Sequence, residues 1–200
     1  MPAEFIYLAS GSPRRRELLR QIGVAFRLLT VAVDESVRGG EAPLDYVARL
    51  AAAKAESGWG TRATPDAAVL AADTAVVLEH EIFGKPRDDR DGEAMLLKLS
   101  GRTHEVLTAV ALRSAAGVES RVSRSEVTFR VIGRAEARAY WDSGEPQDKA
   151  GGYAVQGLGA VFIAHLSGSF SGVMGLPLYE TAELLAAAGV PYWLSAPGAA

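Results

Sequence analysis

The stretch from Ser10 to Arg15 joins a Ser/Gly loop to two adjacent arginines. Ser12 is a favoured N-cap residue and Pro13 suits the first helical position, so the spacing predicts a helix over 13–22. Cations at the positive end of a helix dipole cost roughly 0.3–1 kcal/mol each, so Arg14 and Arg15 indicate a bound anion. Backbone N–H groups and two guanidinium forks suit phosphate. The alternative is that the arginines face solvent or pair with Glu17 and other carboxylates.

Two acidic residues, Asp73 and Glu35, are candidates for binding a metal ion or pairing with a cation. Asp73 interrupts the apolar segment 68–78, where a carboxylate costs several kcal/mol unless it is hydrogen-bonded, paired with a cation or bound to a metal. Glu35 follows a predicted strand, a place where oxygen ligands for Mg²⁺ are common. The alternatives are that Asp73 hydrogen-bonds a turn and that Glu35 is an ordinary loop acid.

Two lysines add positive charge. Lys54 lies at the edge of a predicted apolar helix face, so its stem can pack while its ammonium reaches a cleft. Lys85 follows Gly84, which lets the backbone come close to whatever the ammonium holds. Glycines are dense in 145–157 and 167–178, which indicates tight turns or close approach to a ligand.

The elements that position these residues alternate between strand and helix. Hydrophobic patterning predicts strands at 5–9, 26–33 and 157–166, and a hairpin of 105–113 with 121–131. The apolar runs 68–72 and 75–78 indicate a further strand, which Asp73 interrupts. It predicts helices at 13–22, 44–55, 90–99, 134–141 and 178–188, with a connector at 58–65. Asp88, Asp89 and Asp91 suit a helix start. The order predicts a mixed-sheet α/β protein.

Composition narrows the class of protein. The 200 residues are 48% hydrophobic, enough for a packed core, and we expect one domain over 1–200. A formal charge of −3 disfavours non-specific nucleic-acid binding, and the lack of Cys excludes a thiolate nucleophile and Cys-ligated zinc. His80, His104 and His165 lack metal-ligand spacing. The sequence has no apolar segment long enough for a signal peptide or a membrane span, so we expect a cytoplasmic protein without membrane association.

These motifs, in this order, closely resemble the Maf family of nucleoside triphosphate pyrophosphatases, in its dTTP/UTP pyrophosphatase branch. The resemblance rests on LASGSPRRRELL, VDE, AAAKA, ADTAVVLEHEIFGKP, LSGRTHEVLTAVAL, DKAGGYAVQG and GSFSGVMGLPL, and covers nearly the entire chain. It implies an ITPase-like α/β fold with an elongated mixed sheet flanked by helices, two lobes and a central cleft. It also implies a homodimer and a Mg²⁺ or Mn²⁺ cofactor.

The resemblance assigns roles by motif position. Asp73 matches the catalytic acid, and Glu35 with Asp73 matches the metal-binding pair. Substrate-binding residues are Ser10, Ser12, Arg14, Arg15, Lys54 and Lys85. The implied reaction splits a nucleoside triphosphate between its α- and β-phosphates, a house-cleaning role in nucleotide metabolism. Asp73 either deprotonates the attacking water or holds the metal, and the sequence leaves both open.

Arg14, Thr74 and Gln156 match the positions that track base choice, and they favour dTTP and UTP. The Gln156 amide can donate to O4 and accept from N3–H of a uracil-type base, whereas a carboxylate can only accept. The alternatives are a pyrophosphatase for 7-methyl-GTP or another modified nucleotide, and a non-catalytic nucleotide sensor that regulates cell division. The chain departs from the family pattern at Ala109, Phe170 and Gly172, which puts local shape in doubt.

Overall fold

One seven-stranded sheet organises the chain. The computed structural model describes residues 4–193. The strand order is β2-β1-β3-β5-β6-β7, with β4 pairing β3 as well. The strands are β1 (Ile6–Leu8), β2 (Phe26–Leu28), β3 (Val69–Leu78), β4 (Glu81–Phe83), β5 (Thr103–Ser114), β6 (Gly117–Phe129) and β7 (Ile163–Ser167). β1 pairs parallel with β2 and β3, and the other pairs are antiparallel, so the predicted mixed α/β fold is confirmed.

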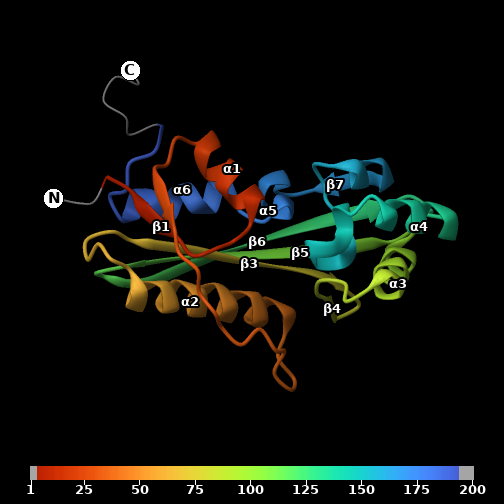
Figure 1. The fold of residues 1–200 in the computed structure, drawn as a ribbon, viewed down its shortest axis with the longest axis horizontal. Coiled ribbons are helices and arrows are strands. Elements are labelled where there is room, and N and C mark those ends of the chain that lie inside the picture. The colour runs from red at the N-terminus through yellow and green to blue at the C-terminus, as the bar shows by residue number, and fades with distance from the viewer. Residues whose placement is uncertain (1–3, 194–200) are drawn as a thin grey trace.

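Helices cover both faces of the sheet (Figure 1). They are α1 (Pro13–Gln21), α2 (Pro43–Thr61), α3 (Asp89–Leu99), α4 (Arg134–Asp142), α5 (Phe170–Met174) and α6 (Leu178–Ala187). α2 lies along one face and α1 and α6 lie on the other, while α3 and α4 pack toward one end. No helix within 4–193 is long and apolar enough to cross a membrane.

The core has three parts, which follow from this layering. Leu8 and Leu70 point to α1 and α6, whereas Tyr7 and Val69 point to α2, as strand alternation requires. A third cluster, which includes Phe129, joins α3 and α4 to the far end of the sheet. Residue 73 of β3 therefore lies between the end of the sheet that packs against α1, α2 and α6 and the end that packs against α3 and α4.

An opening in the sheet lies beside β3. On one edge, β3 pairs with β1 at Val69 and Leu70 and with β4 at Val76, Val77 and Leu78. Between these two partners, residues 71–75 have no strand neighbour on that edge within the described chain. Asp73 and Thr74 thus belong to a long, continuous strand and lie within the stretch of it that is unpaired on this edge.

Several predicted boundaries are wrong. β2 ends at Leu28 rather than at 33, because its partner β1 has only three residues. The predicted connector 58–65 begins too early, since α2 continues to Thr61. Gly58 allows this part of α2 to pack closely against β3, because a Cβ on residue 58 would lie 2.8 Å from Val69 Cγ1. The apolar segment that Asp73 interrupts does form one strand, β3, as expected.

The predicted strand 157–166 is also wrong in its first half. Leu158–Phe162 forms a 3₁₀ helix, η3, and only Ile163–Ser167 pairs with β6. Two shorter 3₁₀ segments, η1 (Glu145–Asp148) and η2 (Ala150–Gly152), precede it. The predicted hairpin and the helix start at Asp88 are confirmed, because the Asp88 side chain accepts a hydrogen bond from the Asp91 N–H.

Candidate active site

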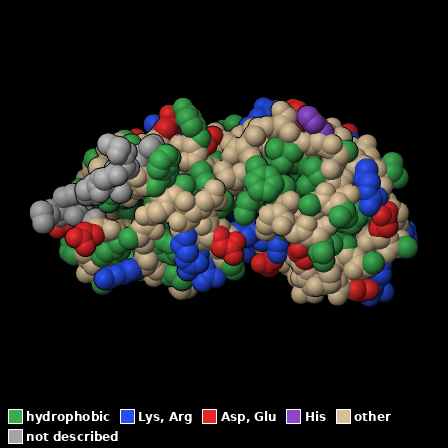
Figure 2. All heavy atoms as spheres, turned by 90° about the horizontal axis from the view of Figure 1, so that it is seen from above, with side chains coloured by type: hydrophobic (Ala, Val, Ile, Leu, Met, Phe, Trp, Pro, Cys, Tyr) green, Lys and Arg blue, Asp and Glu red, His purple; other side chains and the backbone are tan. Residues whose placement is uncertain are grey.

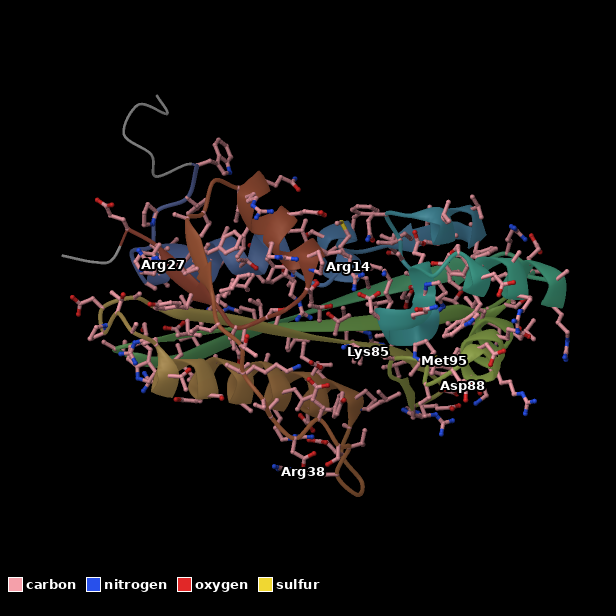
Figure 3. All side chains as sticks on the ribbon, viewed as in Figure 1. Arg14, Arg27, Arg38, Lys85, Asp88 and Met95 are labelled. Carbon is pink, nitrogen blue, oxygen red and sulfur yellow. The ribbon has the colours of Figure 1, made fainter. Side chains whose placement is uncertain are left out.

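A cavity of about 540 Å³ opens beside the unpaired stretch of β3. The residues that the sequence predicted as a site all line it, although they come from six separate segments: Ser10, Ser12, Arg14, Arg15, Glu35, Lys54, Asp73, Thr74, Lys85 and Gln156. In Figure 3, Arg14 and Lys85 lie near the middle of the long axis, with Arg27 toward one end and Asp88 toward the other. The structure therefore brings the whole predicted set together.

Lys54 joins two carboxylates at the centre of the cavity. Its ammonium lies 2.7 Å from Asp73 Oδ1 and 2.6 Å from Glu35 Oε1. α2 supplies the lysine, β3 supplies Asp73, and the segment after β2 supplies Glu35. The Tyr46 hydroxyl donates a hydrogen bond of 3.0 Å to the Glu35 backbone carbonyl, which fixes that segment against α2. Asp73 thus has the cation partner that a buried carboxylate in an apolar strand requires.

The two carboxyls titrate differently. Burial raises the pKa of Asp73 above its ordinary value, although Lys54 and Arg15 act in the opposite direction. The hydrogen bond from Lys54 lowers the pKa of the more exposed Glu35. A buried carboxylate with a raised pKa is a better proton acceptor than an ordinary one, so Asp73 has the properties of a general base.

Arg15 is built into the fold. Its Nε donates to the Gly175 carbonyl at 2.7 Å, and its two terminal nitrogens donate to Ser10 Oγ at 3.1 Å and Thr74 Oγ1 at 3.2 Å. Burial lowers the pKa of Arg15 to about 10, so the guanidinium stays charged at neutral pH. Arg14 makes one such contact, from Nε to the Met174 carbonyl at 3.3 Å. Both arginines thus donate to carbonyls at the C-terminal end of α5, from Met174 and from Gly175, which follows it.

The hydroxyl groups beside Arg15 have fixed roles. Ser10 Oγ accepts from the Ser12 N–H and from Arg15, so its own proton is left to donate. Thr108 Oγ1 donates its proton to the Gly172 carbonyl at 2.8 Å. The 3.0 Å bond between Thr108 and Thr74 must therefore run from the Thr74 hydroxyl to Thr108. Ser10 can donate to a phosphate oxygen, whereas Thr74 can only accept.

Positive charge exceeds negative charge around the cavity. Arg14, Arg15, Lys54, Lys85 and Lys149 line it together with three carboxylates, although the whole chain carries a formal charge of −3. Seen from above, basic and acidic side chains lie side by side near the middle of the molecule, where its outline is indented (Figure 2). A cavity of this size with such a lining suits a polyanion.

Among the cavity residues that the sequence did not predict, Tyr46 and Lys149 carry polar groups. Tyr46 lines the cavity from α2, the helix that also carries Lys54, but Tyr46 itself had no functional signal in the sequence. Lys149 lines the cavity from its position between η1 and η2. Its ammonium is 2.5 Å from Asp148 Oδ1 and 2.7 Å from the Glu145 carbonyl. The motif DKAGGYAVQG contains Lys149, so its charge and its glycine-rich setting were the available signal.

Glu35 and Asp73 are a suitable but incomplete donor set for a divalent cation. Within 4–193 no group of three or more His, Cys, Asp or Glu side chains converges as a metal site. Mg²⁺ commonly takes one or two carboxylates and fills its other positions with water and substrate phosphates. Both carboxylates already converge on one cationic group, the Lys54 ammonium. The residues therefore fit a cation that binds together with a phosphate-bearing ligand.

The fold and cavity define a class of protein, an α/β protein that can hold a polyanion beside one buried carboxylate. Comparison with known sequences identifies the family, because residues 5–188 match the model of the Maf-like proteins. The chain belongs to this family.

Several curated relatives carry the name dTTP/UTP pyrophosphatase. The protein of Saccharophagus degradans is 55% identical over 94% of this chain and 90% of its own length. That of Methylococcus capsulatus is 57% identical over 90% of this chain and 89% of its own length. Among solved structures, the Staphylococcus aureus Ham1 protein has a TM-score of 0.42 and 16% identity, covering 64% of this chain and 72% of that one. The fold assignment rests on the strand order instead.

Proposed function

We propose that this protein is a nucleoside triphosphate pyrophosphatase that hydrolyses dTTP and UTP to the monophosphate and pyrophosphate. The observation that carries the proposal is the buried Asp73, whose partner Lys54 also pairs with Glu35, in the same cavity as Arg14, Arg15 and Lys85. The names of the curated relatives, at 51–57% identity, support the same reaction and the same bases.

The residues have distinct roles in this reaction. Arg14, Arg15 and Lys85 bind the triphosphate, and Ser10 donates its free proton to a phosphate oxygen. A water molecule attacks the α-phosphorus, and the bond from that phosphorus to the bridging oxygen breaks as pyrophosphate leaves. As the base, Asp73 would accept the proton of the water, a role that burial of the carboxyl, which raises its pKa, favours. Lys54 stabilises the ionised form of Asp73 before the proton transfer.

A divalent cation, Mg²⁺ or Mn²⁺, belongs to this proposal. Glu35 and Asp73 are the residues that would hold it, with the substrate phosphates completing its coordination. When bound, such a cation neutralises phosphate charge and lowers the pKa of a bound water. Asp73 would then hold the cation or act as the base, and the two roles predict different metal dependence in an Asp73 variant.

Base choice is assigned to Gln156, Thr74 and Arg14. Gln156 lines the cavity from the segment after η2, and its amide can both donate and accept toward the base. We further propose a single domain with two lobes, consistent with separate core clusters at the two ends of the sheet. The homodimer and the cytoplasmic location remain predictions.

A panel of nucleoside triphosphates tests the proposal. With Mg²⁺ or Mn²⁺ present, pyrophosphate and monophosphate are separated by chromatography, and dTTP and UTP should be turned over fastest. Asp73→Asn should abolish turnover while the thermal unfolding transition persists, and Gln156→Glu should shift the ranking from UTP toward guanine nucleotides. A preference for 7-methyl-GTP would change the substrate, and no release from any triphosphate would favour a nucleotide sensor. Activity like that of the wild type in Asp73→Asn would remove Asp73 from the mechanism.

A further inference from the structure

The segment 154–159 carries Gln156, which lines the cavity. Two side chains that do not line the cavity hold this segment through hydrogen bonds to its backbone. The Tyr140 hydroxyl accepts a hydrogen bond of 3.0 Å from the Ala154 N–H and donates one of 2.6 Å to Glu145 Oε1. The Glu145 carboxylate accepts from the Leu158 N–H at 2.9 Å and from the Gly159 N–H at 3.0 Å. Tyr140 and Glu145 together, here called the loop clamp, therefore bind the chain on both sides of Gln156.

The direction of each bond in the loop clamp is determined. Burial raises the pKa of Tyr140, so the phenol keeps its proton, and the hydrogen bonds that Glu145 accepts help to lower its pKa, so the carboxylate stays ionised. A backbone N–H can only donate, so the Tyr140 oxygen is the acceptor for Ala154 and its proton goes to Glu145. Leu158 and Gly159 begin η3, where the first N–H groups lack partners within the helix. Glu145 supplies those partners.

Two glycines make room for the loop clamp. A Cβ on Gly157 would lie 2.0 Å from Glu145 Oε2, and one on Gly159 would lie 2.7 Å from the Tyr140 hydroxyl. Neither glycine has a positive φ, so backbone freedom is not the reason for them. The sequence Gln156-Gly157-Leu158-Gly159 is thus adapted to the approach of the two side chains.

The loop clamp touches the cavity only through the segment it holds. Tyr153, Ala154, Val155 and Gln156 line the cavity, whereas Tyr140 and Glu145 do not. Tyr140 comes from α4 and packs its ring against Phe162 at 5.2 Å between centroids, so its hydroxyl has a rigid base. A rigid support for a polar side chain is what precise hydrogen bonding to a ligand demands, since a small displacement weakens such bonds.

We propose that Tyr140 and Glu145 are positioning residues that fix the Gln156 amide and so determine how strongly the site prefers uracil and thymine nucleotides over guanine nucleotides. This inference rests on the proposed function and deepens it, because it assigns base selectivity to residues that do not touch the substrate. The loop clamp acts through Gln156, so its effect should disappear when the amide is absent.

The primary test is Tyr140→Phe, which removes the hydroxyl and keeps the ring. We expect the KM for UTP to rise about 5-fold to 10-fold with a much smaller change in kcat, and the ratio of kcat/KM for UTP to that for GTP to fall by a similar factor. Glu145→Gln, which presents an amide NH₂ to backbone donors, should act in the same direction and serves if Tyr140→Phe does not fold. Each variant is checked by thermal unfolding.

Matched controls separate positioning from general destabilisation. Tyr179→Phe is the same change at a tyrosine that is 73% exposed, and Glu136→Gln alters a carboxylate that accepts from the Gly133 N–H at the start of α4. Both should leave the UTP/GTP ratio unchanged. In a Gln156→Ala background, Tyr140→Phe should cause no further change in the ratio. A ratio unchanged in folded Tyr140→Phe and Glu145→Gln, or one that falls equally without Gln156, overturns the proposal.

Binding measurements keep this test separate from the proposed reaction. Calorimetry with α,β-imido analogues of UTP and GTP, which resist cleavage at that bond, reports selectivity without turnover. If the wild-type protein releases no pyrophosphate but Tyr140→Phe still weakens binding of the UTP analogue relative to the GTP analogue, the reaction is wrong and the loop clamp stands. If turnover occurs but neither readout changes in the variants, the reaction stands and the loop clamp is wrong.

Discussion

The two adjacent arginines should respond very differently to the same substitution. Arg15 donates three hydrogen bonds, to Gly175, Ser10 and Thr74, whereas Arg14 donates one, at 3.3 Å, to Met174. Replacing Arg15 by Lys keeps the charge but leaves one nitrogen in place of a planar fork, so we expect about two of the three bonds to be lost. In the sequence the two residues look equivalent.

The expected magnitude follows from these contacts. A hydrogen bond from a charged group contributes about 1.5–3 kcal/mol, so Arg15→Lys should lower the free energy of unfolding by about 3–6 kcal/mol. Total stabilities of domains are about 5–15 kcal/mol, so this is a large fraction. Arg14→Lys, with one long bond at a partly exposed site, should cost less than about 1 kcal/mol.

Urea unfolding followed by circular dichroism measures both variants, with the slope against urea checked for constancy. For a domain of this size the melting temperature of Arg15→Lys should fall by at least about 6 °C, since each kcal/mol shifts it by about 2–4 °C. Arg14→Lys should melt close to the wild type and still raise the KM for UTP. Equal unfolding midpoints for the two variants would refute the assignment of Arg15 to the fold.

Three further predictions concern stability. Burial lowers the pKa of His104 to about 4, so the unfolded chain binds a proton at this residue at higher pH than the folded chain does. The free energy of unfolding should therefore fall by about 3 kcal/mol from pH 6.5 to pH 4. In urea titrations, His104→Gln should show a weaker dependence on pH. Gly58→Ala should cost about 1–3 kcal/mol in the same assay, because its Cβ would meet Val69 Cγ1 at 2.8 Å, and wild-type stability would contradict the packing of α2. Thr108→Val should cost about 1–3 kcal/mol, because the Thr74 hydroxyl loses the acceptor for its proton and the Gly172 carbonyl loses one of its two donors. Thr108→Ser, measured alongside, should retain most of that stability.

The sequence predicted local features well where a short-range rule applies. Pro13 begins α1 and Ser12 occupies the N-cap position, although its side chain makes no capping bond and the Ser12 N–H instead binds Ser10 Oγ. The start of α3 at Asp88 and the hairpin of β5 and β6 are confirmed. Each depends on neighbours in the chain or on simple alternation.

Features that depend on distant partners could not be predicted. The five-residue helix α5 was missed, although carbonyls at its C-terminal end hold both arginines, because backbone acceptors have no residue signature. The partner that Asp73 needs within β3 is Lys54, which is 19 residues away in the chain. The 3₁₀ helix at 158–162 depends on a carboxylate from η1. The residues of the site were found through their motifs, whereas their geometry required the fold.

The opening in the sheet beside residues 71–75 of β3 has a second consequence. A bare strand edge invites pairing with a strand of another molecule, the first step of many aggregation reactions. Here the bare stretch is bounded by β1 and β4, and charged groups such as Asp73 and Lys54 lie beside it. An incoming strand would have to separate the Asp73 carboxylate from the Lys54 ammonium, so we expect this ion pair also to oppose edge-to-edge association of the folded protein.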